Sequence, residues 1–262
     1  MIEINGTEYH LTKNDGENNL HSGLDFYHGR LWKVADADDT HVTFEMDSPD
    51  GDQGYPGALV MKVTYSLDEE NTLMIHYEAE PDQDTIINMT NHSYFNLNGH
   101  KSGDVLNHTL WLNADAFTPA DAASIPTGEI RSVEGTPMDF RTDKTIGKDI
   151  EADYEPLVFG KGYDHNWVLK NEGEFDKVAE VAGDETGIHM SVLTDLPGVQ
   201  IYTANFLDGV KGRDGAVYEM RDAICLETQY YPDAIHHENF PGPICKKGEK
   251  YDTRTAYRFR VK

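Results

Sequence analysis

The chain contains the stretch Leu59-Val-Met-Lys-Val-Thr-Tyr-Ser-Leu-Asp-Glu-Glu-Asn-Thr-Leu-Met-Ile-His-Tyr-Glu-Ala79, in which apolar and polar residues alternate on either side of an acidic turn. A period of two is typical of a β-strand that shows one face to a core and the other to water. Asp68 to Asn71 supply the turn residues between the two alternating runs. We therefore predict a β-hairpin over residues 59–79.

Short runs of the same kind recur along the chain. We expect strands at residues 42–46, 86–90, 110–112, 168–170, 188–194, 199–204, 224–228 and 257–261, the last with Tyr257, Phe259 and Val261 facing inward. Only residues 144–152 show a short helical pattern, and residues 114–140 are polar and contain prolines, which favours a long loop. Many short strands between turns are typical of a sandwich or barrel. Because no linker or repeat interrupts the pattern, we predict one all-β domain over residues 1–262.

The composition restricts the possible partners. The 262 residues include 22 Lys and Arg against 47 Asp and Glu, which gives a formal net charge of −25. Nucleic acid and anionic membrane are not expected as partners, because both bind cationic surfaces. No run of about 18 apolar residues and no signal sequence is present, so we expect a cytoplasmic protein. Cys225 and Cys245 are too few for a disulfide framework, and the apolar run around Cys225 predicts a core position.

Two residues are candidates for proton transfer. Glu227 interrupts the apolar run Ala223-Ile-Cys-Leu-Glu-Thr-Gln-Tyr-Tyr231. A carboxylate there either points to solvent or is buried, and burial raises its pKa. A raised pKa suits a general base. His92 lies in Met89-Thr-Asn-His-Ser-Tyr-Phe-Asn96, and a histidine exchanges protons near neutral pH. It is either the acid partner of Glu227 or a buried histidine satisfied by the backbone.

Four further residues are candidates for ligand binding. Asp164 and His165 lie in Gly162-Tyr-Asp-His-Asn-Trp167, which reads equally as a site or as a solvated turn. Gln200 alternates with Val199 and Ile201, so its amide faces away from the core. His21, in Asn18-Asn-Leu-His-Ser-Gly23, is a weaker candidate. Polar groups mixed with aromatic residues favour a carbohydrate, which offers hydroxyl groups at its rim and C–H faces to aromatic rings.

Several other chemistries lack their motifs. The sequence contains no His-Glu-x-x-His, no paired Cys-x-x-Cys, no Gly-x-Ser-x-Gly elbow and no phosphate loop, and residues 208–215 are glycine-rich without matching one. We therefore expect no metal and no nucleotide cofactor. A glycosidase remains open, because Glu227 and Asp164 could serve as its two carboxylates. The residues alone indicate a sugar-active or sugar-binding β-protein.

Eight segments together resemble the aldose 1-epimerases, also called galactose mutarotases, in the order of that family. They are Asn18–Gly23, Gly54–Gly57, Met89–Leu97, Ile125–Gly128, Tyr163–Asn166, Pro197–Gln200, Asn205–Gly209 and Cys225–Gln229. The resemblance covers nearly the whole chain and implies a large antiparallel β-sandwich, the galactose mutarotase-like supersandwich, that binds its sugar in an open cleft.

The resemblance also implies roles for the candidates. Glu227 is similar to the family's catalytic base and His92 to its catalytic acid, while His21, Asp164 and Gln200 match positions that bind the sugar. The implied activity interconverts the α and β anomers of free hexoses such as galactose and glucose, without cofactor or metal. The expected partner is a small aldose, and the expected state is a monomer or weak homodimer.

One departure from the family keeps alternatives open. Family members begin upstream of the segment that residues 2–10 resemble, and that upstream part holds an Asn-Arg motif whose arginine contacts the sugar; Arg30 lies in a different context. The chain is thus expected to be short at its N-terminus. The main alternative is a non-catalytic sugar-binding protein or an inactive truncated mutarotase. An enzyme acting on a phosphorylated hexose has little support from the scattered arginines.

Overall fold

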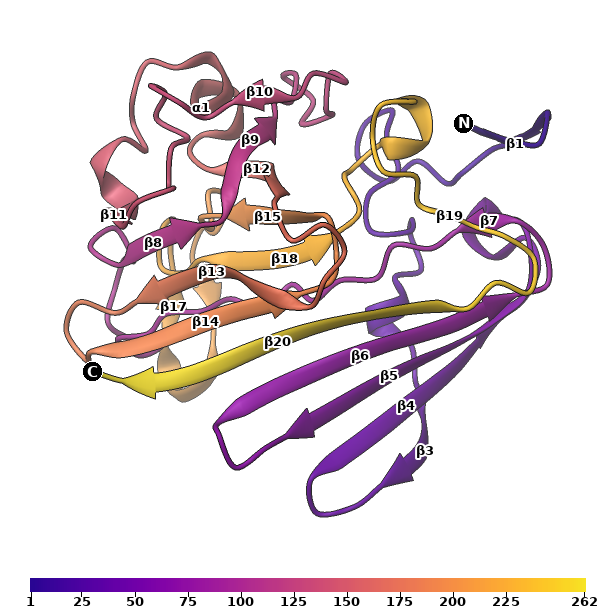
Figure 1. The fold of residues 1–262 in the computed structure, drawn as a ribbon, viewed down its shortest axis with the longest axis horizontal. Helices are drawn as coiled ribbons and strands as arrows, with labels where there is room; N and C mark the ends of the chain where they lie inside the picture. Colours follow the sequence, from indigo (N-terminus) through magenta and orange to yellow (C-terminus); the bar gives the residue numbers. More distant parts are fainter.

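The computed structural model describes residues 1–262 and contains two principal antiparallel sheets (Figure 1). The larger has nine strands in the order β11 (Lys144–Thr145), β8 (Thr109–Leu112), β13 (Asp176–Ala182), β14 (Ile188–Thr194), β20 (Tyr251–Val261), β6 (Thr72–Pro81), β5 (Leu59–Leu67), β4 (His41–Ser48) and β3 (Lys33–Ala37). The smaller has five, in the order β10 (Arg131–Ser132), β9 (Ala114–Thr118), β12 (Asp164–Leu169), β15 (Gly198–Tyr202) and β18 (Cys225–Gln229).

Short elements complete the chain. Three strand pairs lie outside the main sheets: β1 (Ile2–Ile4) with β2 (Thr7–Tyr9), β7 (Thr85–Ile86) with β19 (Ile244–Cys245), and β16 (Val210–Lys211) with β17 (Val217–Tyr218). Helical turns are α1 (Glu155–Gly160), η1 (Tyr27–Gly29), η2 (Asp52–Gly54), η3 (Ile146–Lys148), η4 (Arg213–Gly215) and η5 (Ala234–His236). None of these helices has the length and apolar character needed to cross a membrane. The predicted all-β architecture is confirmed.

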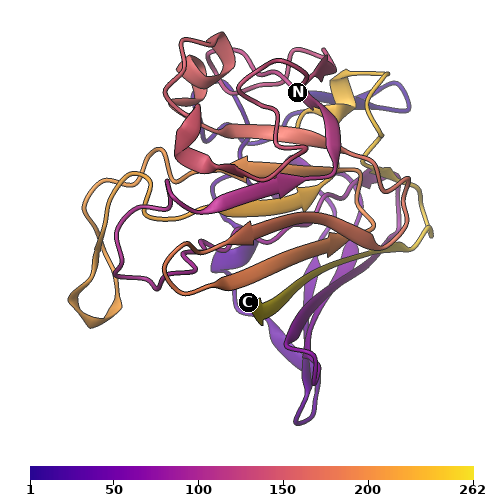
Figure 2. The ribbon, with the colours of Figure 1, turned by 60° about the vertical axis from the view of Figure 1, so that its left-hand side comes forward.

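The two sheets overlap only in part. The five-stranded sheet lies over β8, β13 and β14, which we call the covered half of the large sheet (Figures 1 and 2). Strands β3 to β6, which we call the open half, curve away from the five-stranded sheet and are not covered by it. Strand β20 pairs with β14 on one side and with β6 on the other, so this single strand connects the two halves.

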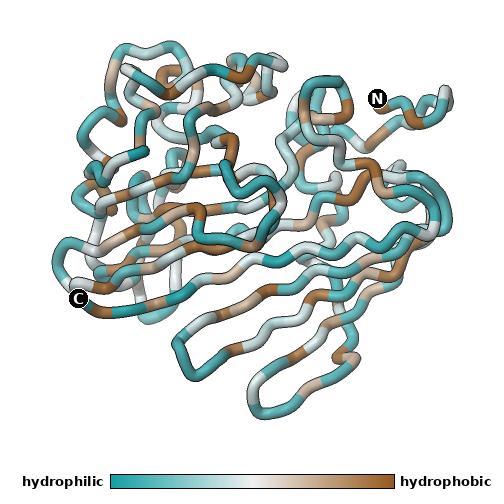
Figure 3. The backbone as a smooth tube through the Cα atoms, in the orientation of Figure 1, coloured by the Kyte–Doolittle hydropathy of each residue, from teal (hydrophilic) through white to brown (hydrophobic).

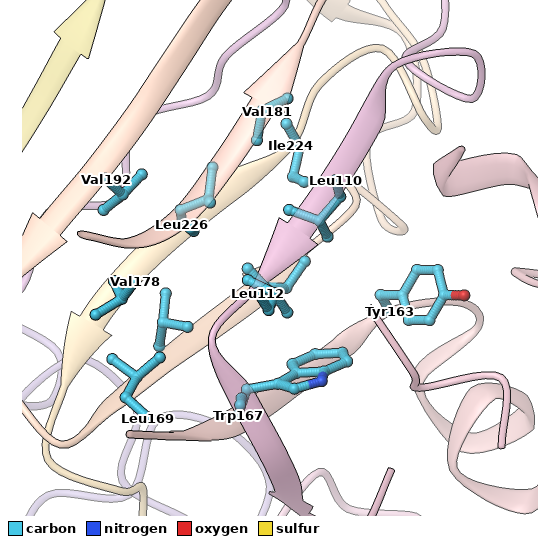
Figure 4. Close-up of a cluster of buried hydrophobic side chains, with 14 of the residues drawn as sticks. Leu110, Leu112, Tyr163, Trp167, Leu169, Val178, Val181, Val192, Ile224 and Leu226 are labelled. Atoms are coloured by element: carbon cyan, nitrogen blue, oxygen red, sulfur yellow. The ribbon is translucent and has the colours of Figure 1, made fainter. Parts of the chain in front are cut away.

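The core fills the space between the covered half and the five-stranded sheet. Leu112 and Val181 come from the large sheet and Trp167 and Leu226 from the small one, and each is at most 1% exposed (Figure 4). The Tyr257 hydroxyl on β20 donates to the Leu226 carbonyl at 3.1 Å and so joins the sheets by a hydrogen bond as well. Full burial of one such aliphatic side chain contributes about 1.5–3 kcal/mol. Because these apolar side chains have to face the core, their packing determines which face of each strand in the five-stranded sheet points inward.

The hairpin predicted over residues 59–79 is confirmed as β5 and β6. Its register pairs Val63 with Tyr77 and Met61 with Ala79, and the hydropathy of these strands alternates along the chain (Figure 3). Their apolar face lines a groove of about 630 Å³ in which 13 of the 21 lining residues are hydrophobic. Leu31 in its lining is 98% exposed. The open half therefore keeps an apolar face that the second sheet does not cover.

The prediction of a helix at residues 144–152 is wrong. Lys144 pairs with Leu110 as part of β11, and η3 follows over Ile146–Lys148. The α-helix begins later, at Glu155, with Pro156 in its first turn. Proline suits that position because its fixed φ is helical and its missing N–H would have no partner there.

Two further expectations need correction. Residues 114–118 belong to β9 rather than to a long loop, since Phe117 pairs with Trp167 and is fully buried. The burial of Phe117 stabilises a strand here although the surrounding sequence is polar. Val261 was expected to face inward but is 73% exposed, because it ends β20 beyond the cover of the second sheet. Tyr257, four residues earlier, is 1% exposed as predicted.

The partial overlap predicts unequal costs for the same truncation in the two halves. Leu112→Ala opens a cavity in the closed core and should lower the free energy of unfolding by about 2–5 kcal/mol. Leu59→Ala, in the partly buried lining of the open groove, should cost about 1 kcal/mol or less, because water already reaches that face. Urea unfolding of both variants measures the difference. Equal costs would contradict an uncovered open half.

Candidate active site

Cross-strand register places two rows of side chains on the outer face of the five-stranded sheet. Gln200 on β15 lies directly opposite Asn166 of β12 and Glu227 of β18. Tyr202 lies in the same way between Asp164 and Cys225. Because residues two apart on a strand share a face, both rows point away from the core. The intervening residues, including Ile201 and Leu226, point into it.

A long segment between β7 and β8 crosses the free edge of β18 and carries His92. The Asn88 side chain binds the backbone of Tyr230 twice, donating to its carbonyl at 3.0 Å and accepting from its N–H at 2.9 Å. Farther along, Phe95 and Ile224 exchange backbone hydrogen bonds of 2.9 and 3.0 Å. The segment is thus fixed beyond both ends of β18, and His92 lies between the two anchors.

His92 and Glu227 are two titratable groups in direct contact on this face. The His92 Nε2 atom lies 3.3 Å from Glu227 Oε1. The Glu227 side chain is 7% exposed and that of His92 is 33% exposed, so solvent or a ligand reaches the pair from the histidine side. His92 is also in aromatic contact with Tyr94, stacked at 5.2 Å between ring centroids, and edge-on with Tyr202 at 5.8 Å.

Burial shifts the pKa values of this face in opposite directions for acids and bases. Desolvation, together with the nearby charge of Asp164, raises the pKa of Glu227 to about 8. Burial raises the pKa of Asp164 to about 6, against a hydrogen bond from Gln200 Nε2 at 2.8 Å that lowers it. The pKa of His92 is lowered, chiefly by burial.

The consequence is a pair that holds one proton near neutral pH. With the carboxyl pKa raised and the imidazole pKa lowered, the dominant form has Glu227 protonated and His92 neutral. Moving that proton to His92 gives the charged form without any exchange with solvent. Such an arrangement can take a proton from one ligand atom and deliver one to another, and its titration belongs to the pair.

His21 reaches the same place from the N-terminal part of the chain. Its ring centroid lies 5.7 Å from that of His92, and its backbone has a left-handed φ of 51° within a turn. His21 also belongs to the lining of the open groove, so the groove begins beside the pair. Arg30 lies in that groove too, but its guanidinium binds the Asp52 carboxylate at 2.5 and 2.9 Å.

The structure therefore brings all five of our predicted residues to one face, and it separates His165 from them. His165 was a candidate alongside Asp164, but its side chain points to the opposite side of β12 and the residue is 2% exposed. Its ring meets Phe117 and Trp167 edge-on, and burial lowers its pKa to about 4. His165 is a neutral core residue.

Three neighbours of the pair were missed by sequence reasoning. Tyr94, Tyr202 and Phe206 form an aromatic wall, with Tyr202 stacked on Phe206 at 6.4 Å and edge-on to Tyr94 at 6.2 Å. Tyr202 and Tyr94 each lie two positions after a predicted residue, Gln200 and His92. The period-two rule applied outward from Gln200 identifies Tyr202, whereas Phe206 lies beyond the strand and gives no such signal.

Two groups of side chains on the protein have the composition of a metal site. The ligand atoms of His92, Cys225 and Glu227 lie within 4.8 Å of one another, as do those of His76, Glu78 and Asp252 on the large sheet. Cys225 is 0% exposed, as its apolar context predicted, yet it shares the face of Glu227.

Comparison with known proteins gives a consistent result. A family model described as aldose 1-epimerase matches residues 1–258. The chain is 42% identical to the galactose mutarotase of Bos taurus and 38% identical to the aldose 1-epimerase of Escherichia coli, in each case over 98% of this chain and 74% of the relative. A solved aldose epimerase homologue from C. elegans superimposes with a TM-score of 0.89 at 30% identity, over 99% of this chain and 78% of that one.

The anchoring of the His92 segment yields a test. Asn88→Ala removes two hydrogen bonds worth about 1 kcal/mol each and lets His92 move away from β18. The pKa of His92, lowered in the native protein, should then rise toward 6.5 as the ring becomes solvated. NMR titration of the ring protons, assigned with His92→Gln, measures this. Asn239→Ala removes an exposed side-chain bond to the Gly128 carbonyl and is the control. An unmoved pKa in Asn88→Ala would contradict the anchoring.

Proposed function

The chain belongs to the aldose 1-epimerase family and interconverts the α and β anomers of aldoses, and we propose that Glu227 and His92 carry the two proton transfers. The observation that carries this proposal is the 3.3 Å contact between His92 Nε2 and Glu227 Oε1 on a face that a ligand can reach. A base and an acid this close can serve two oxygen atoms on the same sugar carbon.

In the proposed reaction, Glu227 takes the proton from the anomeric hydroxyl while His92 delivers one to the ring oxygen. The bond between the anomeric carbon and the ring oxygen breaks, and the open-chain aldehyde forms. Rotation about the bond between the first two carbons presents the other carbonyl face. Reclosure then reverses both transfers and yields the other anomer. No electron or chemical group leaves the sugar, so two proton transfers balance each step.

The remaining predicted residues are proposed to bind the sugar. Gln200 and Asp164 are already joined by a hydrogen bond of 2.8 Å, which leaves the Gln200 carbonyl oxygen without a partner. A sugar hydroxyl can donate to that oxygen, and buried polar atoms are seldom left unsatisfied. His21 would bind from the open side, and the wall of Tyr94, Tyr202 and Phe206 offers ring faces to the C–H groups of the sugar.

Galactose and glucose are the proposed substrates, a small free hexose in each case. The names of the mammalian relatives specify galactose for those proteins. We propose a free rather than a phosphorylated sugar, because the Arg221 guanidinium is already bound to Thr203 and to the Lys161 carbonyl. The Lys161 ammonium lies over the Phe206 ring, 5.2 Å from its centroid. The second candidate function, sugar binding without turnover, is favoured if a sugar binds and its anomers do not exchange faster.

A third prediction concerns Glu227→Gln, which removes the proposed base while keeping side-chain size. The rate of mutarotation of freshly dissolved α-D-galactose, followed by polarimetry above the spontaneous rate, should fall at least about 10²-fold. Galactose binding, measured by calorimetry, should persist within a few-fold. The control is Glu45→Gln, which alters a carboxylate on the open half that pairs with Lys62. Near-normal turnover by Glu227→Gln would refute the assigned role.

A fourth prediction concerns the pH dependence of turnover. Below the lowered pKa of His92 the pair holds two protons and has no base, and above about 8 it holds none and has no acid. The plot of kcat/KM against pH should therefore be bell-shaped, with its alkaline limb near 8. Asp164→Asn removes a charge that raises the pKa of Glu227, so that limb should move to lower pH. A limb that moves upward, or no alkaline limb at all, would contradict the assignment.

A further inference from the structure

A cysteine that the proposed reaction does not use lies against the proton-transfer pair. Cys225 and Glu227 are two residues apart on β18, so their side chains emerge from the same face of the strand. His92 approaches from the segment that crosses the strand edge. The Cys225 thiol, the Glu227 carboxylate and a ring nitrogen of His92 all lie within 4.8 Å of one another.

This donor set matches the chemistry of zinc. Zinc is bound by thiolate, imidazole and carboxylate, and open sites have three protein ligands and a fourth position for water. Ligand atoms around tetrahedral zinc lie roughly 3.5 Å apart, given bond lengths of about 2.0–2.3 Å. The 3.3 Å between His92 Nε2 and Glu227 Oε1 is close to that separation. His92, on an irregular segment and 33% exposed at its side chain, has room to adjust.

Glu227 also lacks other partners. The residue is 5% exposed, and its contact with His92 is the only polar contact its carboxylate makes. A carboxylate this buried is commonly satisfied by several donors or by a cation. Gln200 faces it across the strand pair, but the Gln200 amide nitrogen is directed to Asp164 instead.

The other group of potential metal ligands, His76, Glu78 and Asp252, already has a cationic partner. Lys250 Nζ lies 2.7 Å from Glu78 and 3.0 Å from Asp252, so an ammonium group already occupies the space between those carboxylates. His76 at that place is bound to Asp252 at 2.7 Å. No equivalent cation lies between Cys225 and Glu227.

We propose that His92, Cys225 and Glu227 form a binding site for Zn²⁺ and that zinc bound there reversibly inhibits the enzyme. The inhibition rests on the proposed function, because it follows from occupation of Glu227 and His92; the binding itself does not. On binding, the Cys225 thiol and the Glu227 carboxyl each lose their proton to solvent, so Glu227 binds as the carboxylate. His92 donates its neutral ring nitrogen. The fourth ligand is a water molecule.

Proton release makes the affinity depend on pH. Burial raises the pKa of the Cys225 thiol well above its ordinary value, so the free protein keeps it protonated and unreactive. Zinc affinity should therefore increase with pH, because the metal has to displace the thiol proton. Sugar and zinc should compete, since both need the space in front of His92.

Cobalt provides a readout that requires no activity. Co²⁺ added to the purified protein should produce a thiolate-to-metal charge-transfer band in the near ultraviolet, and added Zn²⁺ should abolish it. Cys225→Ser should lack the band. Cys245→Ser changes the chain's other cysteine, which is also buried but bonds to the Glu249 carbonyl beside β19, and should keep it. Absence of the band in the native protein, or its persistence in Cys225→Ser, would overturn the proposed site.

Polarimetry then tests the consequence. Zn²⁺ should slow galactose mutarotation by the native protein and by Cys245→Ser, and a chelator should restore the rate. Relative to its own zinc-free rate, Cys225→Ser should need at least tenfold more Zn²⁺ for the same inhibition. Equal sensitivity of both variants would overturn the proposal. If the cobalt band forms as expected while native turnover is insensitive to bound zinc, the inhibition and the catalytic assignment fall and the metal site stands.

Discussion

The register between β12, β15 and β18 is the constraint on which the site depends. It places Gln200 opposite Glu227 and Tyr202 opposite Cys225 on the outer face, while Ile201 and Leu226 fill the core. A slip of one residue would exchange the two faces, burying the carboxylate against Val181 and Trp167 and exposing the apolar set. The burial of those apolar side chains therefore fixes the geometry of the polar ones, although no apolar residue takes part in the proposed proton transfers.

The overlap of the sheets explains why the site lies where it does. The covered half and the five-stranded sheet enclose the core, so the outer face of β18 is backed by tightly packed side chains and cannot yield easily. The segment carrying His92 is anchored to that strand through Asn88 and Phe95. His21, in contrast, belongs to the lining of the open half. Glu227 is thus held by a strand that packs on the core, and His92 by hydrogen bonds between its segment and that strand.

Much of this arrangement follows from alternation along the chain. The hairpin of β5 and β6, the bounds of β14 at residues 188–194, and the outward direction of Gln200 were all predicted from a period of two. Pairing between distant strands carries no such local signal, and β20 between β14 and β6 is an example, since its partners are more than 55 residues away in the sequence. The same holds for the contact between His92 and Glu227, which depends on a segment 135 residues earlier that lies at the edge of β18.

The proposed roles of these two residues rest on the family resemblance. His165 shows the limit of an interpretation from the residues alone. Its neighbour Asp164 faces the candidate site, whereas the His165 side chain points into the core.

The pKa shifts of the pair suit a reaction that has to run equally in both directions. In the proposed mechanism, ring opening starts from a charged Glu227 and a protonated His92 and ends with the neutral forms of both. Burial favours the neutral forms, raising the pKa of Glu227 and lowering that of His92, so it stabilises the state in which the aldehyde is bound. The charged form has the same number of protons and is regained when either anomer closes. A pair with ordinary pKa values would be more stable in its charged form. Because the closed ring is bound by the charged form and the aldehyde by the neutral form, the aldehyde would then be the least stable bound state. Removing water from Glu227 thus lowers the energy of the intermediate that both anomers share.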